Sequence, residues 1–188
     1  RASELPELKV LFKSKLPAGA AASADALGIQ PGSLRRIKML AEVDERLLAS
    51  LLTYLEVVKV PPFGTVFNKG DHGDALFMVL EGEVRARVTI GGREMTLATM
   101  GVGECFGELA VVDQGPRSAD VMANQPTVLI KVSDAGLRKM FAEAPALAAP
   151  FTLALTRVIT QRVRVLTKRY EDSIQFSRAA GAAGAAEE

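Results

Sequence analysis

The strongest constraint on the fold is a series of short β-forming runs that alternate with glycine and proline between residues 56 and 132. Runs of β-branched and aromatic residues bounded by turn residues predict strands, and Gly91-Gly92 predicts a two-residue hairpin turn. Many short strands with frequent turns favour an antiparallel barrel or jelly roll, because closure removes exposed sheet edges. The expected strands are Glu56–Val60, Thr65–Asn68, Ala75–Leu80, Glu83–Ile90, Glu94–Ala98, Ser118–Ala123 and Thr127–Val132.

A helical pattern precedes the β-rich stretch. Apolar residues recur at spacings of three and four in two parts, from Leu34 through Ile37 to Leu40 and from Leu47 to Leu55, and Asp44 is a suitable N-cap for the second part. Further upstream, residues 16–28 are rich in alanine and have no clear apolar period, so a linker and a short packed helix are alternatives. We assign residues 1–42 to an N-terminal linker and helical extension.

Two further helices are expected after the β-rich stretch. Ser133 or Asp134 can cap the first, and Pro145 suits the first turn of the second, which we expect to run to about Ser173. Apolar residues form a stripe along this long helix, so the protein is expected to be a monomer or a dimer through the C-terminal helix. The main domain is expected over residues 43–173, followed by a disordered tail at 174–188.

The composition excludes several functional classes. Apolar residues make up 48% of the 188 residues and charged residues 24%, which is typical of a globular protein. The formal net charge of +1 gives no overall attraction to nucleic acid or to an anionic membrane, so an anion must be bound by local groups. The single cysteine, Cys105, excludes an internal disulfide, and the single histidine, His72, disfavours a metal site. We expect no metal and no cofactor, with Cys105 a small core residue and His72 a turn residue.

The sequence also bears on cellular location. No apolar run reaches the roughly eighteen residues that a membrane span requires, and the first residues lack the pattern of a signal peptide. These features predict a cytoplasmic protein or the cytosolic part of a membrane protein. Because the sequence begins at Arg1 without a methionine, it is also consistent with a piece of a longer chain.

One segment, from Gly103 to Ala119, interrupts the β pattern. Its central residues, Gly107–Val112, predict a single helical turn between two strands. The start of a helix presents unpaired N–H donors and a partial positive charge, which suits a phosphate. Arg117 can add a planar charged group and Ser118 a hydroxyl donor. The segment is therefore a candidate site for a phosphate.

Glu108 lies in the same helical turn. A carboxylate repels a phosphate at close range, so we expect Glu108 to contact another part of the ligand. Carboxylates accept hydrogen bonds, and a ribose hydroxyl near the phosphate is a suitable donor. A ligand that carries both groups is a nucleotide. The alternative is a structural ion pair between Glu108 and Arg117.

The segment resembles the phosphate-binding cassette of the cyclic nucleotide-binding domain family, in which F-G-E-L-A is followed by P-R-[AST]-A. Residues 106–110 are FGELA and residues 116–119 are PRSA. The glycine-rich turn at 70–77 and the pair Glu81-Gly82 are similar to the family's loop between early strands. The resemblance covers about Val43 to Ser173. It implies an α+β fold in which an antiparallel β roll, or double-stranded jelly roll, carries the cassette helix and is flanked by N-terminal helices and two C-terminal helices.

The resemblance also implies roles for the cassette residues. Glu108 would bind the ribose 2′-hydroxyl and Arg117 the cyclic phosphate, and Ser118 lies where some members have a threonine or serine that contacts the phosphate or a guanine amine. The implied ligand-binding residues are Gly107, Glu108, Leu109, Ala110, Arg117, Ser118, Ala119 and Arg162, with Gly107 and Ala119 contributing backbone N–H groups. Asp120 departs from the pattern, because members commonly have threonine or serine there.

Arg162 is the one candidate outside the cassette. It interrupts the apolar stripe of the long C-terminal helix, lying three residues after Ile159 and four before Leu166. In the family this helix closes over the base as a lid, so the resemblance implies that Arg162 stacks on the adenine or donates a hydrogen bond to it. The alternative is an arginine whose stem packs on the protein while its charged group stays in water.

The implied function is that of a regulatory signalling domain without enzymatic activity. Binding of a cyclic nucleotide, cyclic AMP in the first place, would be coupled to movement of the C-terminal helices and so to an effector domain or protein outside this chain. The alternatives are a cyclic GMP sensor and a truncated transcription regulator of the catabolite activator type. We expect no nucleic-acid contact through this chain, because little sequence follows the long helix.

Two other classes are less well supported by the residues. An enzyme of the cupin type also uses a jelly roll, but it needs several histidines around a metal, and this sequence has one. A kinase regulatory subunit would carry R-R-x-[A/S/G] before the domain, whereas Arg35-Arg36-Ile37 is followed by Lys38. A nucleotide-gated channel and a stand-alone bacterial receptor both remain compatible with the sequence.

Overall fold

The computed structural model describes residues 22–23 and 29–184 of the 188-residue chain. The chain divides into two compact units, one up to Phe151 and one from Thr152 onward. The linker or helix expected at 16–28 lies outside the described residues, except for a two-residue strand at Ala22–Ser23. The last residues of the expected tail, 185–188, lie outside them as well.

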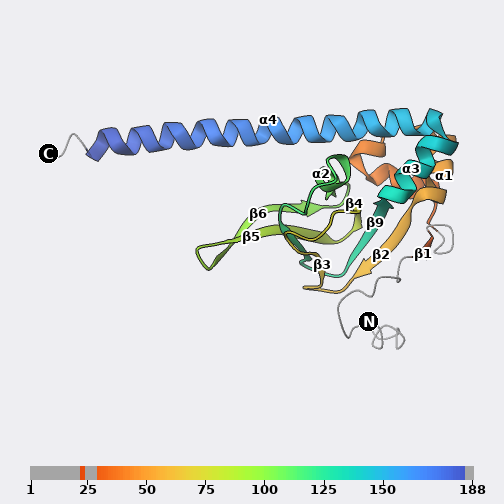
Figure 1. The fold of residues 1–188 in the computed structure, drawn as a ribbon, viewed down its shortest axis with the longest axis horizontal. Coiled ribbons are helices and arrows are strands. Elements are labelled where there is room, and N and C mark those ends of the chain that lie inside the picture. Colours follow the sequence, from red (N-terminus) through yellow and green to blue (C-terminus); the bar gives the residue numbers. More distant parts are fainter. Residues whose placement is uncertain (1–21, 24–28, 185–188) are drawn as a thin grey trace. The chain divides into compact units, whose positions relative to one another are not determined.

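Two antiparallel sheets form the first unit, which confirms the predicted α+β fold with a β roll (Figure 1). The larger sheet has the strand order β1-β2-β9-β4-β7 and the smaller one β3-β8-β5-β6. The strands are β1 Ala22–Ser23, β2 Glu56–Val60, β3 Thr65–Phe67, β4 Ala75–Glu81, β5 Glu83–Ile90, β6 Arg93–Gly101, β7 Cys105–Phe106, β8 Asp120–Ala123 and β9 Thr127–Ser133. All seven expected strands are present, and only the two-residue strands β1 and β7 were not predicted.

The β5–β6 hairpin has the turn that the sequence predicts. Ile90 pairs with Arg93, so that Gly91 and Gly92 form the two-residue loop between them. Both glycines have positive φ, at 58° and 77°. Such values match the turn types that continue the right-handed twist of the strands, and they favour glycine over residues with a Cβ.

The N-terminal helical pattern resolves into several short helices: η2 Pro31–Arg36, η3 Lys38–Leu40, α1 Glu45–Leu51 and η4 Leu52–Tyr54. The first two are 3₁₀ helices that bury Leu34 and Leu40, and Ile37, the extended residue between them, is buried as well. Asp44 caps α1 as predicted, accepting a hydrogen bond of 2.9 Å from the backbone N–H of Arg46.

Two helices follow the roll, α3 at Asp134–Glu143 and α4 at Pro145–Gly184. Ser133 caps α3, since its hydroxyl accepts a hydrogen bond of 3.1 Å from the Gly136 N–H. The long helix was predicted to end near Ser173, but it runs to Gly184. The disordered tail predicted from residue 174 is therefore wrong for residues 174–184. The alanines between 179 and 183 account for the last part of the difference, because alanine has the highest helix propensity.

The second unit continues α4 from Thr152. Threonine hydroxyls at Thr156, Thr160 and Thr167 donate to carbonyl oxygens four residues earlier, at 2.9 to 3.0 Å. These bonds satisfy the hydroxyls within the helix itself. Within the part of the chain that the structure describes, no helix is long and apolar enough to span a membrane.

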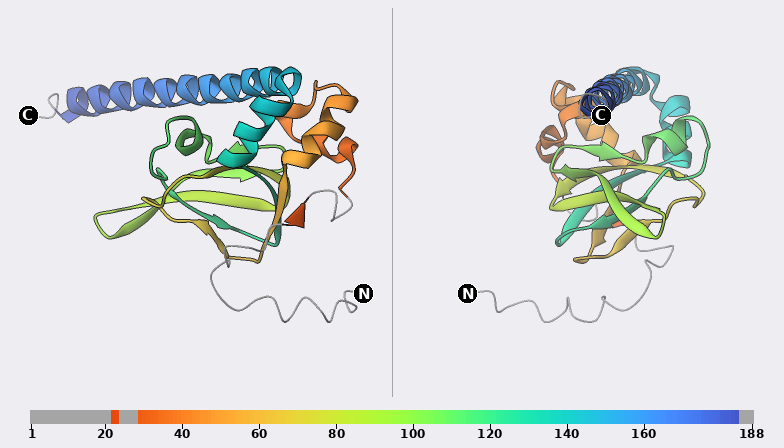
Figure 2. Two further views of the ribbon diagram at one scale, coloured as in Figure 1. Left: turned by 45° about the vertical axis from the view of Figure 1, so that its right-hand side comes forward. Right: turned by 90° about the vertical axis from the view of Figure 1, so that its left-hand side faces the viewer.

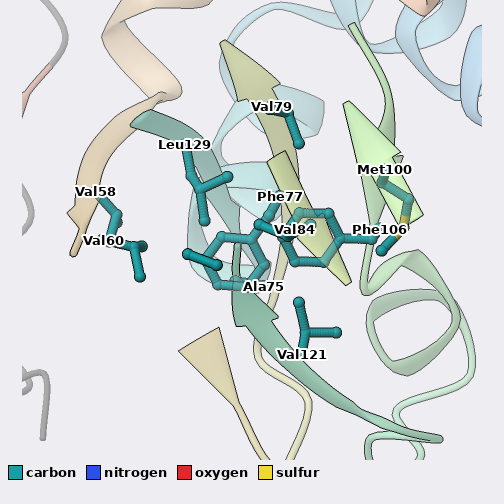
Figure 3. Packing of buried hydrophobic residues seen from close by; sticks show 11 residues of the cluster. Val58, Val60, Ala75, Phe77, Val79, Val84, Met100, Phe106, Val121 and Leu129 are labelled. Atoms are coloured by element: carbon teal, nitrogen blue, oxygen red, sulfur yellow. The ribbon is translucent and has the colours of Figure 1, made fainter. Parts of the chain in front are cut away.

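The core of the roll lies between the two sheets (Figures 2 and 3). Three aromatic rings meet at its centre: those of Phe77 and Phe106 stack with centroids 5.4 Å apart, and the ring of Phe67 lies 5.9 Å from each. The buried residues of this cluster are Val58, Val60, Ala75, Phe77, Val79, Val84, Met100, Phe106, Val121, Ala123 and Leu129. They come from both sheets, so burial of these side chains holds the roll closed.

Candidate ligand-binding site

The predicted helical turn is present as α2, Glu108–Val112, which packs against β4 (Figure 1). It begins at Gly107, whose φ of 77° places it in the left-handed region. A Cβ at this position would lie 2.7 Å from Nη1 of Arg117 and 3.3 Å from the carbonyl oxygen of Ala75. Both the backbone conformation and the close approach therefore require glycine at the start of α2.

Arg117 is buried, with 4% of its surface exposed. Its Nη1 donates to the carbonyl oxygens of Ala75 and Gly107, at 2.7 and 3.0 Å. Its Nη2 lies 3.6 Å from a carboxylate oxygen of Asp74. The buried Nε forms no hydrogen bond within the described residues. The guanidinium is thus held from one side by the chain and keeps donor capacity of its own.

An aromatic ring supports the same guanidinium. The Cζ of Arg117 lies 4.2 Å from the ring centroid of Phe67 and 5.7 Å from that of Phe77. A cation over an aromatic face is attracted by the ring, and more strongly where water is excluded. The guanidinium of Arg117 therefore packs against the aromatic rings at the centre of the core.

The charge on Arg117 is subject to opposing influences. Burial disfavours the charged form and lowers the pKa of this side chain below its ordinary value. Nearby carboxylates act in the opposite direction, those of Asp74, Asp71 and Glu108. The site therefore keeps a guanidinium in a poorly solvated position with negative groups around it, and a further anion at close range would favour its charge in the same way.

The turn between β3 and β4 is bound directly to the cassette. The backbone N–H of Gly70 donates to the carbonyl oxygen of Arg117, and the N–H of Arg117 donates to that of Asp71, both at 2.9 Å. His72 forms an isolated β-bridge with Pro116, as suits the predicted turn residue. Gly73 approaches α2 so closely that a Cβ would overlap the Cβ of Ala110. The turn and the cassette consequently form one packed structure.

The predicted site residues lie at different depths. Glu108, Ala110, Arg117 and Ala119 are buried, whereas Leu109 and Ser118 are exposed and Gly107 is half-buried. Glu108, at 2% exposure, interacts electrostatically with Arg117. The predicted residues other than Arg162 all belong to the segment 107–119. Arg162 lies on α4 in the second unit, and its role as a lid stays a prediction.

An internal ion pair at Arg117 would argue against a ligand role, and the structure shows one with Asp74. The distance between Nη2 and Oδ1 is 3.6 Å, and the Asp74 side chain is 65% exposed. An ion pair with a carboxylate so open to water is weak. It therefore leaves the guanidinium available to an anion that excludes more water.

Sequence reasoning missed the contacts that Asp74, Asp71 and Phe67 make with Arg117. The glycine-rich turn at 70–77 was the signal for the two aspartates, since it was recognised as part of the family pattern without roles for its residues. Phe67 gave no signal beyond the apolar pattern of a strand. No group of three or more metal-ligating side chains occurs in the described parts of the chain.

Sequence comparison assigns the middle of the chain to a known family. Residues 57–144 match the family described as Cyclic nucleotide-binding domain. The chain is 36% identical over 107 residues to the Cyclic AMP receptor protein of Thermus thermophilus. It is 30% identical over 142 residues to the CRP-like cAMP-activated global transcriptional regulator of Mycobacterium tuberculosis. These matches cover 56% and 75% of this chain but 50% and 62% of the two relatives.

Structural comparison agrees with the sequence match. The crystal structure of a cyclic nucleotide-binding domain from Methylobacillus flagellatus superposes with a TM-score of 0.69 and 26% sequence identity. The similarity covers 80% of this chain and 85% of that domain. The chain therefore corresponds to nearly the whole of a solved domain, while it spans less than two thirds of the two curated relatives.

Proposed function

The chain belongs to the cyclic nucleotide-binding domain family, and from that premise we propose that it binds a 3′,5′-cyclic nucleotide, cyclic AMP in the first place, at residues Gly107–Ala119. The observation that carries this proposal is the buried guanidinium of Arg117 beside the start of α2. A buried charge is costly unless it is paired and hydrogen-bonded. Two carbonyls and one exposed carboxylate satisfy it only in part. A cyclic phosphate at Nε and Nη2 would complete the pairing.

The neighbouring residues supply the rest of the ligand contacts. Glu108 accepts the ribose 2′-hydroxyl, which separates its charge from the phosphate while keeping both groups of the ligand satisfied. Backbone N–H groups of Gly107 and Ala119 donate to the phosphate. The exposed hydroxyl of Ser118 is in reach of solvent and hence of a ligand. The proposed role of the site is binding, without catalysis.

The base and the output are finer points of the proposal. The names of both curated relatives refer to cyclic AMP, which supports cyclic AMP over cyclic GMP for this chain. Arg162 contacts the base from α4, and ligand binding shifts α3 and α4 toward a closed arrangement. A hundredfold preference of the ligand for that arrangement would bias it by about 2.7 kcal/mol.

Transcriptional regulation is a second candidate for the output. One curated relative is a transcriptional regulator, and this chain covers 62% of it. In such a protein the movement of α4 would be passed to a DNA-binding domain. The gene sequence beyond the present chain would decide between this output and a separate effector protein.

Calorimetric titration with cyclic AMP and cyclic GMP tests the site. The substitution Arg117→Leu removes the charged partner of the phosphate, so we expect it to weaken binding by about 2 to 5 kcal/mol. Arg138→Leu is the matched control, because Arg138 is 64% exposed and paired with Asp134 on α3. Equal affinities of Arg117→Leu and the unmodified protein would refute the site. Failure of the unmodified protein to bind either nucleotide would refute the function.

A further inference from the structure

We propose that Asp120 is a positioning residue for Arg117, acting through the turn between β3 and β4. Its carboxylate fixes the start of this turn, and the fixed turn holds the guanidinium of Arg117. The expected effect on nucleotide affinity rests on the proposed function, but the positioning itself is a property of the ligand-free chain. Asp120 is the position at which the cassette departs from the family pattern, so the family pattern does not supply its role.

The first step is the contact between Asp120 and the turn. The Oδ1 atom of Asp120 accepts a hydrogen bond of 2.7 Å from the backbone N–H of Lys69. The strands β3 and β8 pair at Phe67 and Val121, and β3 ends at that pair. Within a sheet, a backbone N–H is paired with a carbonyl oxygen of the neighbouring strand. Just beyond the end of β3, the Asp120 carboxylate accepts the backbone N–H in place of such a carbonyl oxygen.

The second step is that Arg117 holds the adjacent residues of the same turn. Its carbonyl oxygen accepts from the N–H of Gly70, and its own N–H donates to the carbonyl oxygen of Asp71. Asp120 and Arg117 thus bind consecutive turn residues, Lys69 through Asp71. Within the turn, Asp71 also accepts a 2.8 Å hydrogen bond from the Asn68 N–H. These bonds leave the turn little conformational freedom.

The third step leads from the turn back to the guanidinium. Asp74 and Ala75 close the turn, and they provide the carboxylate at 3.6 Å and the carbonyl oxygen at 2.7 Å that face Arg117. Ala75 is also fixed by its pairing with Ser133 of β9, and the carbonyl oxygen of Asp74 accepts the N–H of Asp134. Loss of the Asp120 anchor would therefore act on Arg117 through its backbone hydrogen bonds to Gly70 and Asp71 and through the Asp74 side chain.

A second contact orients the Asp120 carboxylate. Its Oδ2 lies 3.9 Å from Nε of Arg87 on β5, and Arg87 also forms an ion pair with Glu94 on β6. One carboxylate oxygen of Asp120 thus contacts the turn at Lys69, and the other contacts Arg87 on the sheet. A threonine or serine, which members of the family commonly have at this position, offers a single hydroxyl oxygen and no charge. The carboxylate is therefore suited to hold both groups at once.

The test compares Asp120→Ala with Asp120→Asn in the full chain. The alanine variant loses the acceptor, and we expect its affinity for cyclic AMP to fall about tenfold. The asparagine variant keeps an acceptor oxygen for Lys69 and should bind within about threefold of the unmodified protein. Asp44→Ala is the matched control: it also deletes a carboxylate that accepts a backbone N–H, at 2.9 Å, but on α1. It should leave the affinity unchanged.

A second measurement in the ligand-free protein separates this proposal from the proposed function. The Nε–H signal of Arg117 in nitrogen-15 NMR should shift in Asp120→Ala, and keep its position in Asp120→Asn and Asp44→Ala. An unchanged signal in Asp120→Ala overturns the positioning role, whatever the protein binds. Equal losses of affinity in the alanine and asparagine variants overturn the role of the acceptor oxygen. Absence of nucleotide binding by the unmodified protein refutes the proposed function, while the NMR signal still decides the role of Asp120.

Discussion

The helices α2 and α3, which precede β8 and follow β9 in the sequence, begin in different ways. α3 starts at Ser133, whose hydroxyl accepts the N–H of Gly136, so a side chain at its own start caps it. The N–H of Asp134 donates in addition to the carbonyl oxygen of Asp74, at 2.7 Å. α2 starts at Gly107, which has no side chain to cap the helix and adopts a left-handed conformation. α3 has a local side-chain cap, whereas α2 has none and its start depends on contacts with other segments.

The difference in length has the same implication. α3 has ten residues and α2 has five. A single turn is unstable by itself, since forming the first helical hydrogen bonds fixes several residues at once. α2 is consequently held by packing on Gly73 and β4 and by the contacts of Arg117. A segment that depends on such contacts can respond to a ligand that changes them.

The largest effect is expected from Gly73→Ala. An added Cβ would overlap that of Ala110 and come within 3.1 Å of the Gly115 carbonyl oxygen, so the turn and α2 must separate. Overpacking of this kind costs about 3 kcal/mol of stability, and we expect nucleotide binding to be lost with it. Chemical denaturation and calorimetry measure both. Gly32→Ala, which has no atom within 4 Å, is the control, and similar results for the two would show that α2 tolerates displacement.

Gly107→Ala should have a smaller effect on stability and a clear effect on binding. The left-handed conformation costs a residue with a Cβ about 1 to 2 kcal/mol. The Cβ would also lie 2.7 Å from Nη1 of Arg117, so the guanidinium has to move. Gly91→Ala in the β5–β6 hairpin imposes the same kind of strain at φ 58° with no atom within 4 Å. If both variants bound cyclic AMP equally well, the position of Arg117 would not matter to the ligand.

Local sequence patterns predicted the parts of the fold that local interactions determine. The existence and order of the seven longer strands followed from residue alternation and turn residues, and the caps of α1 and α3 followed from Asp44 and Ser133. The helical turn at α2 also followed from its sequence, because Gly107 breaks the β pattern there. The length of α4 was underestimated because a run of alanines was interpreted as disorder rather than as helix.

The contacts within the candidate site could not be predicted in the same way. The ion pair of Arg117 with Asp74, its packing on Phe67 and the anchor from Asp120 to the turn join segments that are about 40 to 50 residues apart in the sequence. Periodicity describes one segment at a time and gives no distance between two of them. The family pattern predicted which residues gather at the cassette, and the structure was needed to show what holds them.

Phe67→Leu probes the aromatic support of Arg117. Leucine keeps an apolar side chain in the core but removes the ring face 4.2 Å from the guanidinium, so we expect affinity for cyclic AMP to fall by about 1 kcal/mol. Phe106→Leu is the control, because Phe106 belongs to the same aromatic cluster. Phe106→Leu should lose more stability in thermal denaturation, because Phe106 is buried and Phe67 only partly buried. A drop in affinity of the same size in both would assign the effect to core packing instead of to the cation–π contact.

Ser133→Ala, on the other helix, should change stability alone. Loss of the cap leaves the Gly136 N–H without its acceptor and costs about 1 kcal/mol of unfolding free energy. Because the Ser133 hydroxyl caps α3 locally and α3 contributes no residue to the segment 103–119, nucleotide affinity should stay the same. Ser133→Asp, which keeps an acceptor oxygen, should restore most of the stability. A loss of affinity in Ser133→Ala would mean that α3 shapes the cassette in the ligand-free state. The two helices would then differ in how they are capped, but both would contribute to ligand binding.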